Sequence, residues 1–253
     1  MLLRAIVLHV SATAILGMAA AVAQERKPPV PSGLDPGGVA IALISTGIDY
    51  TLPAIASRLA RDGEGELIGW DLEDKDRRPF DRQRGTAPPE SGGDGTIVAS
   101  LLLSAPGVRL VPVRVDPVTP LSLARALAFV AQTPARIAVM PMAAGAEGDW
   151  TPFRQAATHF KDVLIIVPAG AGPATVFAGA LLPENVLVIV NGTTSADAAG
   201  FGGTARRVVG IPVAISAAAR AAATMMARQT GSAGAVRKDL SETGGSPVWH
   251  AQK

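Results

Sequence analysis

Short runs of purely apolar residues, each of strand length, alternate with segments of helical character along this chain. The clearest runs are VAIALI at 39–44, VLIIV at 163–167 and VLVIV at 186–190. A strand with one face in water alternates apolar and polar residues, whereas these runs are apolar on both faces. Strands buried on both faces and separated by helices are typical of a parallel sheet. The sequence therefore predicts a three-layer α/β domain with a mainly parallel sheet.

The apolar runs and the helical segments between them predict the positions of six strands and five helices. Strands are predicted at 39–44, 66–70, 108–115, 137–140, 163–167 and 186–190, and helices after Thr51, at 96–104, 121–132, 152–161 and 216–228. Ligand sites in such sheets gather at the carboxyl ends of the strands. The segment 71–93 is charged and contains Pro and Gly. Because Lys75 and Arg77-Arg78 offset its acidic residues, we expect a solvated loop there rather than a cation site.

The first 23 residues have the pattern of a secretory signal. One positive charge at Arg4 precedes an apolar stretch, and Ala21-Val22-Ala23 places small residues where a signal peptidase cleaves. The alternative is a membrane anchor, but polar residues interrupt the stretch, namely His9, Ser11 and Thr13. We expect cleavage before Gln24 and a soluble periplasmic or extracellular protein with no membrane segment after cleavage.

Differences in amino-acid composition divide the rest of the chain into three segments. Residues 24–38 form a Pro/Gly-rich arm, 39–228 carry the strand and helix patterns, and 229–253 read as a disordered tail with Gly and Ser. The arm leaves no room for a folding prodomain between the signal and the domain. We therefore expect one reduced α/β domain at 39–228.

Composition excludes several classes of function. Charged residues are 17% of the 253, the formal net charge is +2 and aromatic residues are 4%, which argues against a nucleic-acid partner. The chain has no cysteine, so disulfides, thiolate nucleophiles and iron–sulfur clusters are absent. Its three histidines are His9, His159 and His250, and none has ligand partners at metal spacing. No metal or other cofactor is expected.

A glycine cluster leaves a nucleotide-binding alternative open. Residues 168–173, PAGAGP, follow an apolar strand and begin like a dinucleotide fingerprint. Thr175 stands at the third glycine position, Pro173 interrupts the turn, and no lysine follows in the P-loop arrangement. A plain strand-to-loop turn is the favoured interpretation.

Taken in order, the strand-end segments resemble the subtilisin-like serine peptidases. VAIALISTGIDY at 39–50 is similar to that family's VAVIDTGIDY, and GDGTIVAS at 93–100 is similar to its GHGTHVAG. Further blocks follow in the family's order: PVRV at 112–115, VMPMA at 139–143 for NMSLG, PAGA at 168–171 for AAGN, NVLVIVNG at 185–192 for NVIAVGA, and AISAAA at 214–219 for GTSMAA. The resemblance covers roughly 39–228 and implies a subtilisin-like fold.

The resemblance also assigns site positions. It places Ser45 at the family's catalytic aspartate, Asp94 at its histidine, and Ser216 at its nucleophilic serine, which opens the last helix. It places Ala171 at the oxyanion-hole asparagine, and Met142 and Ala143 on the edge that holds substrate as an added strand. Pro141 removes an N–H donor from that edge.

These substitutions remove the groups that the reaction needs. A serine hydroxyl requires a base with a pKa near neutrality, and a carboxylate with a pKa near 4 is a poor one. Ser45 has no charge to orient such a base, and Ala171 has no donor for an oxyanion. The plain structural roles are that Asp94 caps the helix after it and Ser45 closes a turn. Carboxylate-based catalysis, as in the sedolisins, lacks a second acidic group at Ser45, and His159 is expected to lie away from the strand ends.

The sequence thus predicts an exported subtilisin-like pseudoprotease that binds a peptide or protein across the former cleft. The competing hypothesis is a serine endopeptidase with Ser216 as nucleophile and a non-standard base. The third is a nucleotide-binding domain at Gly170 to Gly172.

Overall fold

The computed structural model describes residues 27–81, 95–168, 183–189, 195–199, 205–228 and 231–242. Asp94, Ala171, the glycines at 170 and 172, and the predicted signal lie outside these residues.

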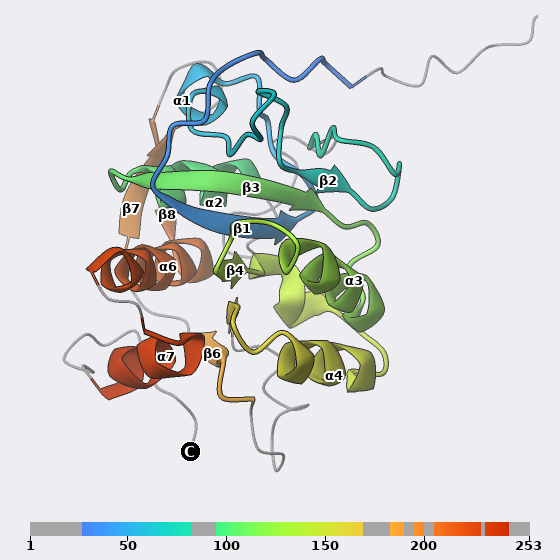
Figure 1. Ribbon diagram of the computed structural model, residues 1–253, viewed down its shortest axis with the longest axis vertical. Coiled ribbons are helices and arrows are strands. Elements are labelled where there is room, and N and C mark those ends of the chain that lie inside the picture. The colour runs from blue at the N-terminus through green and yellow to red at the C-terminus, as the bar shows by residue number, and fades with distance from the viewer. Residues whose placement is uncertain are drawn as a thin grey trace, which may run out of the picture.

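A six-stranded parallel sheet forms the centre of the domain and confirms the predicted fold class (Figure 1). Its order is β2-β3-β1-β4-β5-β6. The strands are β1 (Val39–Ser45), β2 (Trp70–Asp71), β3 (Val108–Arg114), β4 (Ile137–Val139), β5 (Leu164–Pro168) and β6 (Val186–Ile189). All five neighbouring pairs are parallel, so their carboxyl ends share one edge of the sheet.

Helices cover both faces of the sheet. They are α1 (Pro53–Ala56), α2 (Gly95–Leu103), α3 (Pro120–Val130), α4 (Thr151–His159), α6 (Ile211–Arg228) and α7 (Ala233–Glu242), with a 3-10 helix η2 (Pro141–Gly145). Figure 1 shows α6 and α7 on one side of the sheet and α3 and α4 on the other. A separate antiparallel hairpin, β7 (Ser195–Ala199) with β8 (Ala205–Val209), precedes α6.

Two apolar cores follow from the alternation along β1. Ile41 and Leu43 face the core shared with α2, α6 and α7, while Ala42 and Ile44 face the core shared with α3 and α4. All four side chains are fully buried. A strand that must be apolar on both faces reads as a continuous apolar run, which is why the run at 39–44 was informative.

The C-terminal part differs from the prediction. The helix expected at 216–228 begins five residues earlier, at Ile211, because Pro212 is tolerated in a first turn and Val213, Ala214 and Ile215 bury apolar surface. The predicted strand at 66–70 is also shorter and later, at Trp70–Asp71.

The expectation of disorder from 229 onward is wrong for 233–242, which form α7. This helix buries three apolar side chains against the core: Ala233, Val236 and Leu240. Their spacing of three and four residues places them on one helix face. The helix was not predicted because neighbouring Gly and Ser residues are typical of loops.

Two segments expected to be solvated are bound to the domain. The described part of the arm, 27–38, is held by hydrogen bonds, among them Tyr50 Oη to Pro28 O at 2.7 Å and the Arg61 N–H to Asp35 Oδ2 at 2.8 Å. In the charged loop, Asp71 is fully buried. Most residues of 27–38 nevertheless remain exposed, among them Leu34 at 88%, and so do Glu73, Lys75, Arg77 and Arg78 of the loop. Both segments are therefore exposed to solvent, as expected, but are anchored to the domain at Lys27, Asp35 and Asp71.

Asn185 connects α4 to the sheet and gives a test of the fold. Its Nδ2 lies within 3.0 Å of Ala157 O, 3.2 Å of Phe160 O and 2.9 Å of Val163 O, and the side chain is buried. We expect Asn185→Ala to lower the free energy of unfolding by about 2–4 kcal/mol, because it leaves buried carbonyl oxygens without a donor. Urea unfolding measures this. Gln132→Ala removes an exposed amide-to-carbonyl bond and should change stability by less than about 0.5 kcal/mol; equal effects would contradict the assignment.

Candidate functional site

Ser45, the last residue of β1, closes a tight turn at the carboxyl edge of the sheet. Its Oγ accepts a hydrogen bond from the Gly47 N–H and donates one to Gly47 O, both at 3.2 Å. The side chain is 1% exposed. Gly47 has φ of +120°, a conformation that L-residues with side chains rarely adopt, so the turn depends on this glycine. The turn-closing role predicted for Ser45 is confirmed.

The first turn of α2 packs directly on this turn. A methyl group on Gly95 would collide with Gly47 O and with the Ser45 hydroxyl. Thr96 Oγ1 accepts a hydrogen bond from the Asp49 N–H at 2.9 Å. The described parts of the two segments that the resemblance matched most closely, 39–50 and 95–100, therefore meet in space. Asp94, whose helix-capping role stays a prediction, precedes this turn and lies outside the described residues.

Ser216 is inside α6 rather than at its start. It is the sixth residue of the helix and has no exposed surface. Its Oγ has no hydrogen-bond partner among the residues that the structure describes. The expectation that Ser216 opens the last helix is wrong, and the first turn, Ile211 to Ala214, contains no hydroxyl group.

Met142 and Ala143, the predicted substrate edge, are in the 3-10 helix η2. The Ala143 N–H donates to Met140 O at 3.2 Å, and Ala143 O accepts from the Ala146 N–H at 3.2 Å. Ala143 is fully buried. A peptide added as a strand needs an extended edge with free backbone groups. The expected edge is therefore not present at these two residues.

His159 is the last residue of α4, and its ring contacts that of Phe160 with centroids 4.7 Å apart. Phe153 and Ala157 of α4 belong to the core on one face of the sheet, and Ala214 and Ala218 of α6 to the core on the other. The sheet thus separates the helix of His159 from that of Ser216, as predicted when His159 was placed away from the strand ends.

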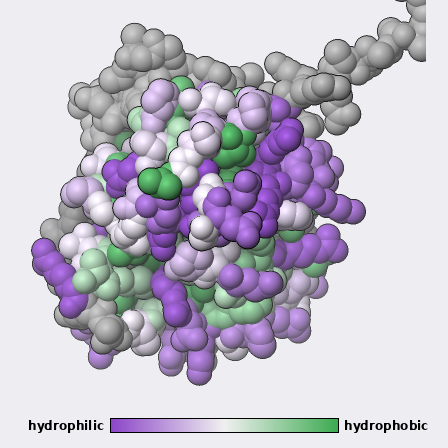
Figure 2. Space-filling model, turned by 45° about the horizontal axis from the view of Figure 1, so that its top comes forward, coloured by the Kyte–Doolittle hydropathy of each residue, from purple (hydrophilic) through white to green (hydrophobic). Residues whose placement is uncertain are grey.

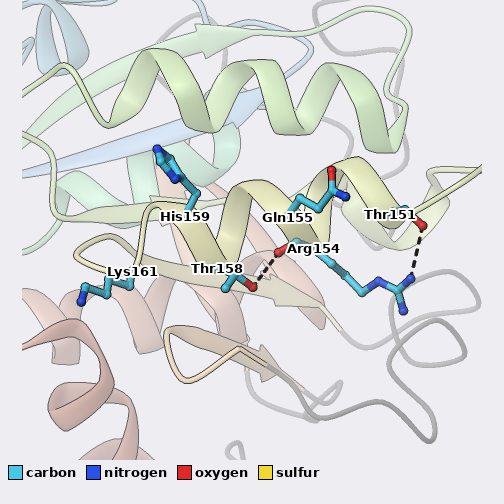
Figure 3. Close-up of a pocket in the computed structure, with 6 residues that line it drawn as sticks. All are labelled: Thr151, Arg154, Gln155, Thr158, His159 and Lys161. Carbon is cyan, nitrogen blue, oxygen red and sulfur yellow. Dashed lines mark hydrogen bonds between the residues drawn. The ribbon is translucent and has the colours of Figure 1, made fainter.

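The surface of α4 carries a shallow hollow without converging groups. Six residues line it: Thr151, Arg154, Gln155, Thr158, His159 and Lys161. Figure 3 shows that His159 and Arg154 project from opposite sides of the helix. Arg154 Nη2 is hydrogen-bonded to Thr151 Oγ1 of its own helix at 3.3 Å (Figure 3). Side chains that diverge in this way do not form a common ligand site.

An ionic network occupies the ends of β2 and β3. Arg114 Nη1 lies 3.0 Å from Asp71 Oδ2, and its Nη2 lies 2.9 Å from Asp116 Oδ2. The Arg114 Nε donates to Thr46 O at 3.1 Å, next to Ser45. Sequence reasoning missed this network, although Asp71 directly follows the predicted strand 66–70 and Arg114 lies next to the end of the predicted strand 108–115. Within the described ranges, no group of three or more His, Cys, Asp or Glu side chains is placed to hold a metal ion.

A half-enclosed hollow of about 190 Å³ lies beside the network, between the ends of β2 and β3 and the start of α3. Its apolar walls include Leu72, Val115 and Leu121, and Glu73 and Arg125 also line it. Leu121 is 47% exposed. On the face shown in Figure 2, hydrophilic residues dominate and hydrophobic ones form separate spots. The hollow is smaller than the clefts of about 300–1,000 Å³ that hold small-molecule ligands.

Comparisons with known proteins support the fold. No protein-family model and no curated protein matches the sequence. Among solved structures, a cold-adapted subtilisin-like serine proteinase is similar over 82% of this chain and 82% of its own, with a TM-score of 0.57 and 19% identity. Fervidolysin from Fervidobacterium pennivorans, a keratinolytic enzyme related to subtilisin, is similar over 78% of this chain and 37% of its own, with a TM-score of 0.53 and 17% identity. No helix of the described part is both long and apolar enough to cross a membrane. This chain therefore has a subtilisin-like α/β fold.

Proposed function

We propose that this chain is an exported pseudoprotease, a subtilisin-like scaffold that does not hydrolyse peptides and binds a protein at the strand-end edge of its sheet. The observation that carries the proposal is the burial of Ser216 inside α6. A nucleophile must reach the substrate carbonyl, and a hydroxyl without exposed surface does not. The pattern of the first 23 residues supports export.

Ser45, which the resemblance places at the family's catalytic aspartate, supports the same proposal. The Ser45 hydroxyl is engaged in its own turn and supplies no negative charge to orient a base. Disabling the nucleophile–base unit costs about 10⁶ in rate, and removing an oxyanion donor about 10²–10³; the measured example behind both figures is a subtilisin. Losses of this size abolish ordinary proteolysis.

The endopeptidase hypothesis needs an accessible Ser216 and a base beside it. His159 is on a helix across the sheet from α6. His250, Asp94 and the glycines of the nucleotide-binding alternative lie outside the described residues. No described group favours either alternative over the pseudoprotease.

The shape of the strand-end edge favours a folded protein over an extended peptide as partner. The backbone of η2 is engaged in its own turn and offers no edge for an added strand. The hollow beside Leu121 instead suits a single apolar side chain presented by a rigid surface. Glu73 and Arg125 at the same hollow add charges of both signs for polar contacts.

We expect no reaction of the purified protein with a fluorophosphonate probe and no hydrolysis of casein between pH 3 and pH 9. The buried hydroxyl of Ser216 is neither accessible nor activated. In-gel fluorescence and release of labelled casein fragments measure the two activities, with subtilisin as the positive control. Labelling that disappears in Ser216→Ala would overturn the proposal, and labelling that persists in that variant would point to another serine.

We expect a photoreactive benzoylphenylalanine at Leu121 or Glu73, introduced in the producing cells, to cross-link one defined protein partner. Both positions line the strand-end hollow. The control position is Lys238, which is 72% exposed on α7. Mass spectrometry of the cross-linked band identifies the partner. The binding proposal is wrong if the same band arises from position 238 or if neither strand-end position yields a band.

A further inference from the structure

Lys27, at the start of the described arm, places its ammonium group among three carboxylates of the charged loop. Its Nζ lies 2.5 Å from Asp71 Oδ2, 2.6 Å from Asp74 Oδ2 and 3.1 Å from Asp76 Oδ1. The Lys27 side chain is 5% exposed and that of Asp71 is not exposed. Lysine is rarely buried to this extent unless its charge is paired. These contacts span 44 to 49 residues of sequence, so they fix the arm to a distant part of the chain.

Hydrogen bonds within residues 71–76 hold the carboxylates of the loop in position around Lys27. Asp71 Oδ1 accepts hydrogen bonds from the N–H groups of Glu73 and Asp74, at 2.9 and 3.1 Å. The Asp71 N–H in turn donates to Asp76 O at 2.8 Å. The loop thereby closes on itself and holds its three carboxylates on one cation.

The contact extends to the turn at Ser45. Asp71 is shared between Lys27 and Arg114, and the same guanidinium donates to Thr46 O. Because three charged groups in a buried network depend on one another, removing one leaves the others incompletely paired. A change at Lys27 therefore alters the support of the turn that follows β1.

The arm covers Tyr50 as it continues. The Tyr50 hydroxyl donates to Pro28 O at 2.7 Å, and the ring lies edge-on to Phe80 with centroids 5.2 Å apart. Further along, Arg61 donates to Pro31 O at 2.6 Å, and Asp35 pairs with Arg109 at 2.5 Å. Burial raises the pKa of the Tyr50 hydroxyl well above its usual range.

We propose that residues 27–38 form a strap that Lys27 locks onto the domain, and that the lock supports the Thr46 turn through Asp71 and Arg114. The strap is an integral part of the fold, so processing of the N-terminus must end before Lys27. Opening the lock frees the strap, uncovers Tyr50 and leaves the turn after Ser45 less restrained.

The charge of Lys27 persists over the working pH range. Burial alone would lower the pKa of its ammonium, but the hydrogen bonds to Asp71, Asp74 and Asp76 outweigh burial and hold that pKa above its ordinary value. A raised lysine pKa gives stability that is complete below the unfolded value of about 10.5 and is lost as the pH rises further. The lock therefore opens by loss of Lys27 or of its acidic partners, not near neutral pH.

The test uses the full-length gene with Lys27→Met, Lys27→Arg or Lys238→Met, and compares the exported products. Intact mass gives the N-terminus of the wild-type product, which must retain Lys27. Lys27→Met should lower the melting temperature by roughly 10 °C, because it breaks a buried ion pair and leaves carboxylates unpaired. Lys27→Arg keeps the charge and should recover part of the loss. Lys238 is exposed and 3.9 Å from Glu242, so Lys238→Met should leave the melting temperature within roughly 1 °C.

Tyr50 reports the strap directly, because it is the only tyrosine in the chain. In the wild type, tyrosinate absorbance at 295 nm should not develop near pH 10, whereas in folded Lys27→Met it should develop near the ordinary tyrosine pKa of about 10. Hydrogen exchange should accelerate at 28–38 and 46–48 but not in α4. The strap is refuted if Lys27→Met folds with unchanged Tyr50 titration and unchanged exchange at 28–38, or if the wild-type product begins after Lys27.

Discussion

The burial of β1 on both faces is the constraint on which the remaining structure depends. Each of its central side chains is fully covered, by α2 and α6 on one face and by α3 on the other. The register of β1 with β3 and with β4 fixes where the carboxyl ends of these three strands lie relative to one another. Ser45, Arg114 and the start of η2 consequently lie at one edge of the sheet, and every group discussed as part of the site is placed relative to it.

At this edge, several polar groups are already held by hydrogen bonds and ion pairs within the chain. The Ser45 hydroxyl is used by its own turn, the backbone of η2 by a 3-10 helix, and Arg114 by two carboxylates and a carbonyl. Satisfied polar groups of this kind stabilise a fixed structure, whereas catalysis requires groups that are held in place but still unpaired. The same internal hydrogen bonds and ion pairs that stabilise this edge of the sheet are consistent with the proposed loss of hydrolysis.

Much of the fold could be predicted from sequence, because the apolar runs at 39–44, 163–167 and 186–190 have a single physical explanation. The site was predicted less well. Placing Ser216 at the start of a helix required the exact first residue of α6, and in an alanine-rich segment neither propensity nor periodicity marks it.

The contacts of Lys27 were beyond sequence reasoning for a different reason. They join residues more than 40 positions apart, and the mixed acidic and basic residues of 71–78 are equally compatible with a loop in water. The helix α7 was missed because three apolar residues among Gly, Ser and charged neighbours give a weak pattern.

The buried face of α6 consists largely of methyl groups, from Ala214, Ala218, Ala219, Ala222 and Ala223. Alanine has no rotamers to lose on burial, so this helix approaches the sheet closely at little cost in side-chain entropy. The same closeness leaves no volume for larger residues, because overpacking a dense interior forces the backbone to move. A residue larger than alanine at any of these five positions would therefore displace α6 from the sheet and disturb the core between them.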